Sequence, residues 1–330
     1  MPQPPHHRYG IAEWFGQDIT TLPPTVRKTY AQLAMLQTKT GDLSDAPICP
    51  FLSSLNAHAR CNKASGVCTL RRFSQQDAGI GTPVPGDQVV TVCPSRFLER
   101  TVEGIHRFAW LSQVMLDIQN PTVIKETPFL HQISNEEGSS KASRIDWILL
   151  DPNTVRANDP AWCAVETQSL YFSGDKMQQE FEAYAATPTA VLFPAGRRRP
   201  DYRSSGPKRL APQLDVKVPG LRNWGKKMAI LVDRYFFENM NRLDDAYSHA
   251  RNDRERRDNS DVIWFVVDYD DQLHMREYAV LFTTLESSRH ALNATAPLSK
   301  GDFTQSLQQL IQDESHPNKV FRVSTPTTLE

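Results

Sequence analysis

Two carboxylates within a pair of short apolar segments are the residues of this sequence best suited to chemistry. Asp146 lies in residues 144–151 and Glu166 in residues 161–169, and a connection rich in turn-forming residues joins the two segments. Both segments have the composition of short β-strands, and their connection predicts that they are neighbours in one sheet. Asp and Glu are disfavoured in strands and are seldom buried without a partner, which makes both acids candidates for function.

Gln168 extends this set, because it follows Glu166 by two positions. Side chains alternate along a strand, so the two leave the same face. If Asp146 leaves that face of the adjacent strand, three oxygen-bearing side chains converge. Together with the backbone carbonyl of Thr167, they suit a hard cation such as Mg²⁺. The spacing is not specific by itself, since solvent-facing acids produce the same pattern by chance.

A second candidate site is made of cysteines. Four of the five lie within 45 residues, at Cys49, Cys61, Cys68 and Cys93, in a segment rich in turn formers and poor in aliphatic residues. Four thiolates can hold one zinc or iron ion tetrahedrally, and the metal then supplies folding energy that packing does not. The alternative is a set of separate buried thiols. Cys163 stands apart and is expected to be a core residue.

Length and composition set broad limits. The 330 residues suffice for one large domain or two modest ones, and 39 % apolar with 23 % charged residues is typical of a soluble protein. The net charge of −1 gives no overall attraction to nucleic acid. No apolar run is long enough to span a membrane, and residues 1–8 read as a disordered tail without the apolar core of a signal peptide. We therefore expect a cytoplasmic protein without membrane contact, in a compartment that favours metal sites over disulfides.

Basic residues gather in one loop that contains Pro and Gly. Arg197, Arg198, Arg199 and Arg203 lie there, with Lys208 shortly after. Such a loop beside a metal site is suited to contact DNA phosphates, and Arg can also read guanine in the major groove. The alternative is an ordinary solvated loop.

The remaining chain predicts an α/β (α+β) fold with a mixed β-sheet flanked by helices. Apolar periodicity predicts helices at residues 25–38, 96–118, 174–186, 226–243 and 303–312. Further strands are predicted at residues 123–133, 190–193, 262–267 and 278–282.

The order of these landmarks resembles the NotI-type restriction endonucleases, which belong to the PD-(D/E)xK nuclease superfamily. The matching pieces are residues 11–16, 49–52, 61–63, 66–68, 92–96, 146–147 and 166–168, with a looser likeness at 226–235 and 264–266. These pieces span most of the chain. Each is weak alone, whereas the ordered cysteine set combined with Glu-x-Gln is specific.

The resemblance implies a PD-(D/E)xK nuclease core with DNA-recognition insertions at residues 96–330, preceded by an N-terminal Cys₄ module in residues 9–95. It implies a type II enzyme of a bacterial restriction–modification system that cuts palindromic, GC-rich double-stranded DNA as a homodimer. Asp146 and Glu166 would hold the catalytic Mg²⁺. Gln168 would replace the lysine that most of the superfamily has at this position.

The resemblance further implies a structural metal held by Cys49, Cys61, Cys68 and Cys93. That metal is iron in this family, and zinc would suit the same ligands. A cognate DNA methyltransferase is expected in the same system, without direct contact to this chain.

The sequence departs from the family pattern in two places. An additional acid before Asp146 has no clear counterpart, Glu126 being the nearest, and the stretch after Gln168 is divergent. The recognition site need not be the family's best-known one. The alternatives are a non-catalytic DNA-binding protein with a Cys₄ module, a less specific repair or phage nuclease, and a zinc-containing regulatory protein.

Overall fold

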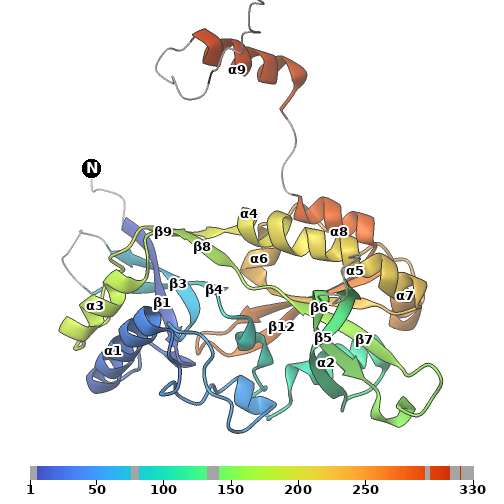
Figure 1. The fold of residues 1–330 in the computed structure, drawn as a ribbon, viewed down its shortest axis with the longest axis horizontal. Helices are drawn as coiled ribbons and strands as arrows, with labels where there is room; N and C mark the ends of the chain where they lie inside the picture. Colours follow the sequence, from blue (N-terminus) through green and yellow to red (C-terminus); the bar gives the residue numbers. More distant parts are fainter. Residues whose placement is uncertain (1–5, 76–81, 132–140, 294–297, 313–319, 321–330) are drawn as a thin grey trace, which may run out of the picture. The chain divides into compact units, whose positions relative to one another are not determined.

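The computed structural model of the protein describes residues 6–75, 82–131, 141–293, 298–312 and 320. Residues 1–293 form one compact unit, and residues 294–330 form a second. The first unit contains a six-stranded sheet, a four-stranded sheet and a two-stranded ribbon (Figure 1).

The six-stranded sheet is the core of the first unit, with the strand order β12-β11-β10-β7-β6-β5. Its strands are β5 (Thr122–His131), β6 (Lys141–Leu150), β7 (Trp162–Thr167), β10 (Met228–Asp233), β11 (Val262–Tyr269) and β12 (Met275–Thr283). The three central strands β7, β10 and β11 are parallel, whereas the outer pairings are antiparallel. The predicted mixed sheet is confirmed, including the pairing of the two acid-bearing strands.

Helices cover both faces of this sheet. Alternate residues such as Ile148 and Ala164 pack in one apolar cluster with helices α5 (Ala211–Asn223) and α8 (Leu285–Leu292). The residues between them belong to a second cluster that includes helix α2 (Arg107–Leu116) and the four-stranded sheet. Figure 1 shows α5 and α8 on one side of the sheet and α2 on the other.

The four-stranded sheet has the order β2-β1-β3-β4. Its strands are β1 (His6–Trp14), β2 (Gln17–Asp18), β3 (Val67–Gln75) and β4 (Val84–Thr91). One expectation is corrected here, because residues 6–8, predicted to belong to a disordered tail, pair with β3. The cysteine-containing segment, predicted to be rich in turns, also contributes β3 and β4 to the sheet. Buried Val67, Leu70, Phe73 and Val90 provide the apolar material for this sheet.

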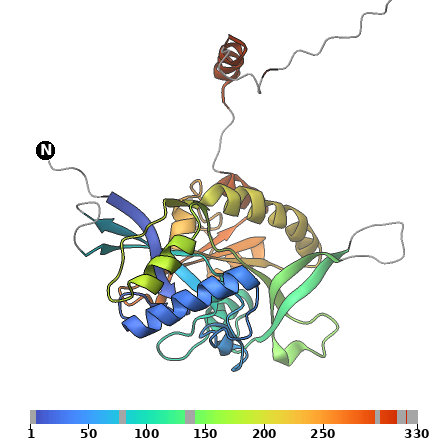
Figure 2. The same cartoon turned by 60° about the vertical axis from the view of Figure 1, so that its left-hand side comes forward.

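The predicted helix at residues 25–38 is confirmed as α1 (Pro24–Thr40), and that at 174–186 as the shorter α3 (Gln178–Ala186). These two helices lie against each other (Figure 2). The remaining elements of the first unit are η1 (Leu52–Ser54), η2 (Pro94–Leu98), η3 (Pro152–Thr154), β8 (Tyr171–Gly174), β9 (Arg198–Asp201), α4 (Tyr202–Ser205), η4 (Gly206–Leu210), α6 (Arg234–Glu238) and α7 (Asp253–Asn259).

The predicted helix at residues 226–243 is wrong. The structure has strand β10 followed by the short helix α6, which Asp233 caps by accepting a hydrogen bond from the Phe236 amide at 2.7 Å. All six residues of β10 are buried, because it is a central parallel strand covered on both faces. Five of its six residues are apolar, so the helical spacing of Met228, Leu231 and Val232 carries no information about the backbone.

Two other predicted elements are corrected. The helix expected at residues 96–118 is interrupted, because the chain turns back between Arg100 and His106 through Gly104, which has a φ of 82°. Only η2 and α2 are helical there, and Val102 is 80 % exposed instead of lying on an apolar stripe. The strand expected at 190–193 is irregular chain.

The strand predicted at 123–133 corresponds to β5, and residues 132–133 lie outside the described part. Pro128 is accommodated in β5 because this strand is at the sheet edge and has a bulge beside it. In the second unit, the predicted helix at 303–312 is confirmed as α9 (Lys300–Gln312), whose residues are all exposed. Across the described residues, no helix combines the length and apolarity that crossing a membrane requires.

Candidate active site

The structure brings Asp146 and Glu166 together on one face of the six-stranded sheet. Trp147 pairs with Val165 across β6 and β7, so the next position in the register sets Asp146 opposite Glu166. Both acids lie on the face that α5 covers, since Ile148 and Ala164 two residues away pack there. The backbone N–H of Asp146 donates to Glu166 Oε1 at 3.4 Å. The predicted convergence of the two carboxylates is therefore observed.

Each carboxylate has one oxygen engaged and one free among the described residues. Asp146 Oδ2 accepts hydrogen bonds from the backbone N–H and the hydroxyl of Thr167, at 3.0 and 3.2 Å. Glu166 accepts its hydrogen bonds at Oε1. Asp146 Oδ1 and Glu166 Oε2 are left as acceptors, which is the donor type that Mg²⁺ requires.

The pKa of Glu166 is raised, as is common for carboxyl groups at functional sites. Its side chain is only 2 % exposed, and burial raises its pKa to about 7, with a further rise from the negative charge of Asp146. The ammonium group of Lys217 opposes this rise. A divalent cation between the two acids would stabilise their charged forms, so the electrostatics fit the binding of a metal ion.

Gln168 lies just beyond the end of β7, where its backbone N–H donates to Leu231 O at 3.0 Å. Its side-chain amide donates to Ser169 O at 2.6 Å. The amide oxygen thus remains available as an acceptor, but the side chain makes no hydrogen bond to Asp146 or Glu166.

Lys217 is the residue of this site that the sequence analysis missed. It projects from α5, is 1 % exposed, and donates from Nζ to Glu166 Oε1 at 2.6 Å. The signal was a cation within an apolar helical stripe, because Leu214, Val218 and Leu221 surround it at helical spacing. No helix was predicted over residues 211–223, so the position of this lysine among apolar residues could not be recognised from the sequence.

Glu126, the candidate for an additional acid, neighbours Asp146 in the β5–β6 register, because Lys125 pairs with Trp147 and Thr127 with Ile145, but its side chain contacts cations at the surface. It is half-exposed, forms ion pairs with Lys125 at 2.9 Å and Arg144 at 3.3 Å, and has a φ of 51° at the irregular part of β5. Its known partners are therefore surface cations, not Asp146 or Glu166.

The predicted DNA-binding arginines separate into two groups. Arg197, Arg199 and Arg203 are exposed, on and beside β9. Arg198 is buried and forms an ion pair with Glu180 on α3, donating to both carboxylate oxygens. Because alternate residues of a strand face opposite ways, the Arg-Arg-Arg run cannot present all three guanidinium groups to one partner.

Two of the exposed arginines border a groove of about 540 Å³ that also reaches strand β1. Arg197 and Arg199 line it together with His6, His7 and Arg8 of β1. Figure 1 shows the β8–β9 ribbon between the six-stranded sheet and β1. Both β1 and the ribbon therefore contribute positive charge to one surface, a combination that the sequence alone did not reveal.

The four clustered cysteines are buried free thiols. Backbone hydrogen bonds hold the chain segment of Cys49 against that of Cys61, and the segment of Cys68 against that of Cys93. The Cys49 and Cys61 amides donate to Ala59 O and Pro47 O, whereas the Cys93 amide donates to Cys68 O at 3.1 Å. Burial raises the pKa of Cys61 to about 11, and the charges of Cys49 and Cys93 add to the rise. Within the described residues, no three or more His, Cys, Asp or Glu side chains are already arranged to hold a metal ion.

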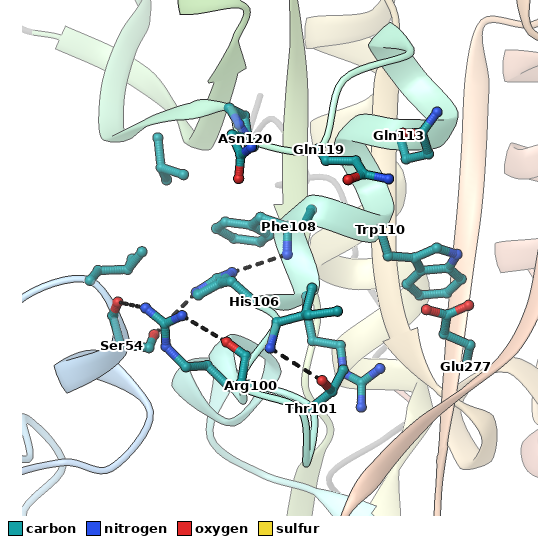
Figure 3. Close-up of a pocket in the computed structure, with 17 residues that line it drawn as sticks. Ser54, Arg100, Thr101, His106, Phe108, Trp110, Gln113, Gln119, Asn120 and Glu277 are labelled. Carbon is teal, nitrogen blue, oxygen red and sulfur yellow. Dashed lines mark hydrogen bonds between the residues drawn. The ribbon is translucent and has the colours of Figure 1, made fainter.

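A pocket of about 680 Å³ lies between the cysteine segment and α2, away from the two acids (Figure 3). His106 accepts from the Phe108 amide at 3.0 Å, capping α2, and its other ring nitrogen contacts Ser54 at 3.1 Å. Burial and the neighbouring cations Arg100 and Arg107 lower the pKa of His106 to about 4. This neutral ring is committed to holding the segments together and is not a candidate base.

Comparison with known families defines the class of protein. Residues 34–280 match the family model described as restriction endonuclease NotI, whereas no curated protein matches the sequence. The chain is a site-specific deoxyribonuclease that acts on double-stranded DNA. It belongs to the NotI restriction endonuclease family, whose members are type II restriction endonucleases. The match includes both acids and all four clustered cysteines.

Proposed function

We propose that the protein hydrolyses both strands of a palindromic, GC-rich DNA site in a Mg²⁺-dependent reaction, with Asp146 and Glu166 as the metal ligands of a PD-(D/E)xK core. The observation that carries this proposal is the pairing of the acids on adjacent strands, each with one oxygen that no described residue engages. When bound, Mg²⁺ would stabilise negative charge at the scissile phosphate and make water a better nucleophile.

Hydrolysis requires that the water oxygen bond to phosphorus while the ester bond to the leaving sugar oxygen breaks. Water loses a proton to solvent, and the leaving oxygen gains one. Asp146 and Glu166 would hold the Mg²⁺ beside the phosphate, because two carboxylates without the metal would repel it. Gln168 is neutral and is no base near pH 7, but its free amide oxygen can accept a hydrogen bond from the attacking water.

The exposed arginines support the DNA-binding part of this proposal. Arg197, Arg199 and Arg203 would contact phosphates, where fixed positive charge contributes affinity without reading sequence. A homodimer would place one such site on each strand, because a two-fold axis in the enzyme matches that of a palindrome. Protection of the host site would come from a cognate methyltransferase that does not contact this chain.

The cysteine segment would act as a structural module. Cys49, Cys61, Cys68 and Cys93 lie close enough to influence one another's charge, and the Leu52 amide donates to Cys49 Sγ at 3.4 Å. Hydrogen bonds of this kind stabilise thiolates. We propose that the four cysteines bind one iron or zinc ion, which loss of metal on substitution of a cysteine by serine would test.

The test of function is digestion of large GC-rich genomic DNA by the purified protein with Mg²⁺, beside Asp146→Ala. Discrete fragments produced only by the wild type would establish site-specific cleavage, and sequencing their ends would define the site. A smear would indicate a less specific nuclease. Intact DNA across substrates of differing methylation would refute the enzymatic proposal.

A further inference from the structure

Lys217 occupies an unusual position for a lysine. Its side chain enters the acid-bearing face of the sheet from α5, and it is as buried as the leucines around it. Nζ donates to Glu166 Oε1 at 2.6 Å and to Gln213 Oε1, one helical turn earlier, at 2.8 Å. An ammonium group has three hydrogens, so two are used by these contacts and one remains.

Stability alone gives a poor reason for this arrangement. Removing two charges from water costs several kcal/mol per ion, and apolar residues of similar volume often serve a core at least as well. The surrounding Leu214, Val218 and Leu221 show that this helix face otherwise packs with apolar side chains. Unlike the equally buried Glu180–Arg198 pair, this pair leaves one carboxylate oxygen unengaged among the described residues, which indicates a function that needs the charge of the lysine.

We infer that Lys217 is the catalytic ammonium group of this active site, delivered from helix α5 instead of from the strand position held by Gln168. It fixes the Glu166 carboxylate through Oε1, so that Oε2 remains free, and its third hydrogen is available to an oxygen of the scissile phosphate or to the attacking water. This inference rests on the proposed function, because it assigns a role within the same site.

The contrast with Gln168 supports the assignment. Gln168 directs its amide group to the adjacent Ser169 carbonyl and carries no charge. Lys217 Nζ lies 2.6 Å from Oε1 of Glu166, a metal-ligand candidate. Charge that develops on phosphate oxygens in a water-poor site is stabilised strongly by a fixed cation.

The experiment measures three properties of Lys217→Met on a duplex carrying the site mapped with the wild type. We expect single-turnover cleavage to fall about 10²- to 10³-fold, the usual effect of removing one such donor. DNA binding without Mg²⁺ and calorimetric binding of Mn²⁺ without DNA are expected to persist, because Asp146 and Glu166 remain. Lys217→Arg should recover part of the rate. Lys227→Met, which removes a half-buried lysine bonded to the Asp258 and Ser260 carbonyls, is the control and should cleave as the wild type does.

Two results would overturn the inference. Cleavage by Lys217→Met within about threefold of the wild type would show that no charge is needed there. Loss of Mn²⁺ binding together with cleavage would show that Lys217 only holds the acids in place. If Lys217→Met melts at a much lower temperature, Lys217→Gln, a polar but uncharged variant, replaces it with the same expectations. Absence of cleavage by the wild type would instead refute the proposed function.

Discussion

Two buried ion pairs of this molecule use their carboxylates differently. In the Glu180–Arg198 pair, both carboxylate oxygens accept from the guanidinium group, and the Gly196 amide adds a third hydrogen bond at 3.1 Å. In the Glu166–Lys217 pair, the ammonium contacts a single oxygen, at 2.6 Å. Both pairs are almost fully buried. The first is saturated and joins α3 to the β8–β9 ribbon, whereas the second leaves coordinating capacity unused.

The number of engaged carboxylate oxygens separates a structural ion pair from one that can take part in a reaction. A bidentate arginine engages both oxygens of a carboxylate, so neither is left for a metal ion without displacing the guanidinium group. Glu166 keeps a free oxygen, has a second acid beside it, and has a pKa raised to about 7. Burial is common to both pairs; the unused oxygen is what distinguishes the site.

The largest effect should come from Asp146→Asn, which keeps the shape of the side chain and removes its charge. We expect cleavage to fall at least about a thousandfold, because a metal ligand contributes several kcal/mol to the transition state. Folding should be nearly unaffected, since the amide oxygen can still accept from Thr167 and the repulsion with Glu166 disappears. Cleavage assays and urea unfolding measure both. A strongly destabilised but active variant would reverse the assignment.

Glu180→Gln is the matched change in the saturated pair. We expect the free energy of unfolding to fall by about 3 kcal/mol, because Arg198 keeps its charge but loses its counterion. Cleavage per folded molecule should be retained. Urea denaturation measures the free energy of unfolding of this variant and of Glu182→Gln, an exposed control on the same helix. The difference between the two variants isolates the effect of the buried pair. A large loss of activity without loss of stability would place Glu180 in the functional machinery.

The two pairs should also differ in their response to pH. In the proposed site Glu166 would bind metal when ionised, so at low Mg²⁺ the cleavage rate should fall about tenfold per unit as the pH drops below about 7. Raising Mg²⁺ should move this fall to lower pH, because the metal binds the deprotonated form. Rate profiles at several Mg²⁺ concentrations measure the shift. A fall centred near pH 4.5, or one insensitive to Mg²⁺, would contradict it.

The smallest effects are expected at the exposed arginines. Arg199→Ala and Arg203→Ala should each weaken DNA binding a few-fold and reduce the slope of log affinity against log salt by about one. Arg251→Ala, exposed elsewhere, is the control. Binding isotherms at several salt concentrations give the slopes. An unchanged slope for both variants would remove the β9 surface from the DNA interface.

Sequence patterns predicted the pairing of the two acid-bearing strands because the evidence for it is local. Asp146 and Glu166 lie in short apolar segments joined by the turn-rich residues 151–161, so the pairing of the two strands followed from neighbouring residues alone. The helix predicted over β10 was wrong because a strand buried on both faces has no alternation to detect. The broken 96–118 helix depended on a turn at Gly104 that apolar spacing did not reveal.

Lys217 and Arg198 show the limit of this reasoning. Whether a basic side chain contacts solvent, DNA or a buried acid depends on how its element docks in three dimensions. Lys217 reaches Glu166 across 51 positions of sequence, and Arg198 turns inward because it alternates with exposed neighbours on β9. Charge alone predicted neither position.

The most direct test of the central claim is a crystal structure of the protein grown with Mn²⁺, with anomalous scattering used to locate the metal. We expect one Mn²⁺ bound by Asp146 Oδ1 and Glu166 Oε2, and no peak at this position in Asp146→Asn. An active enzyme whose metal binds elsewhere, with both oxygens unengaged, would contradict the assignment of the active site.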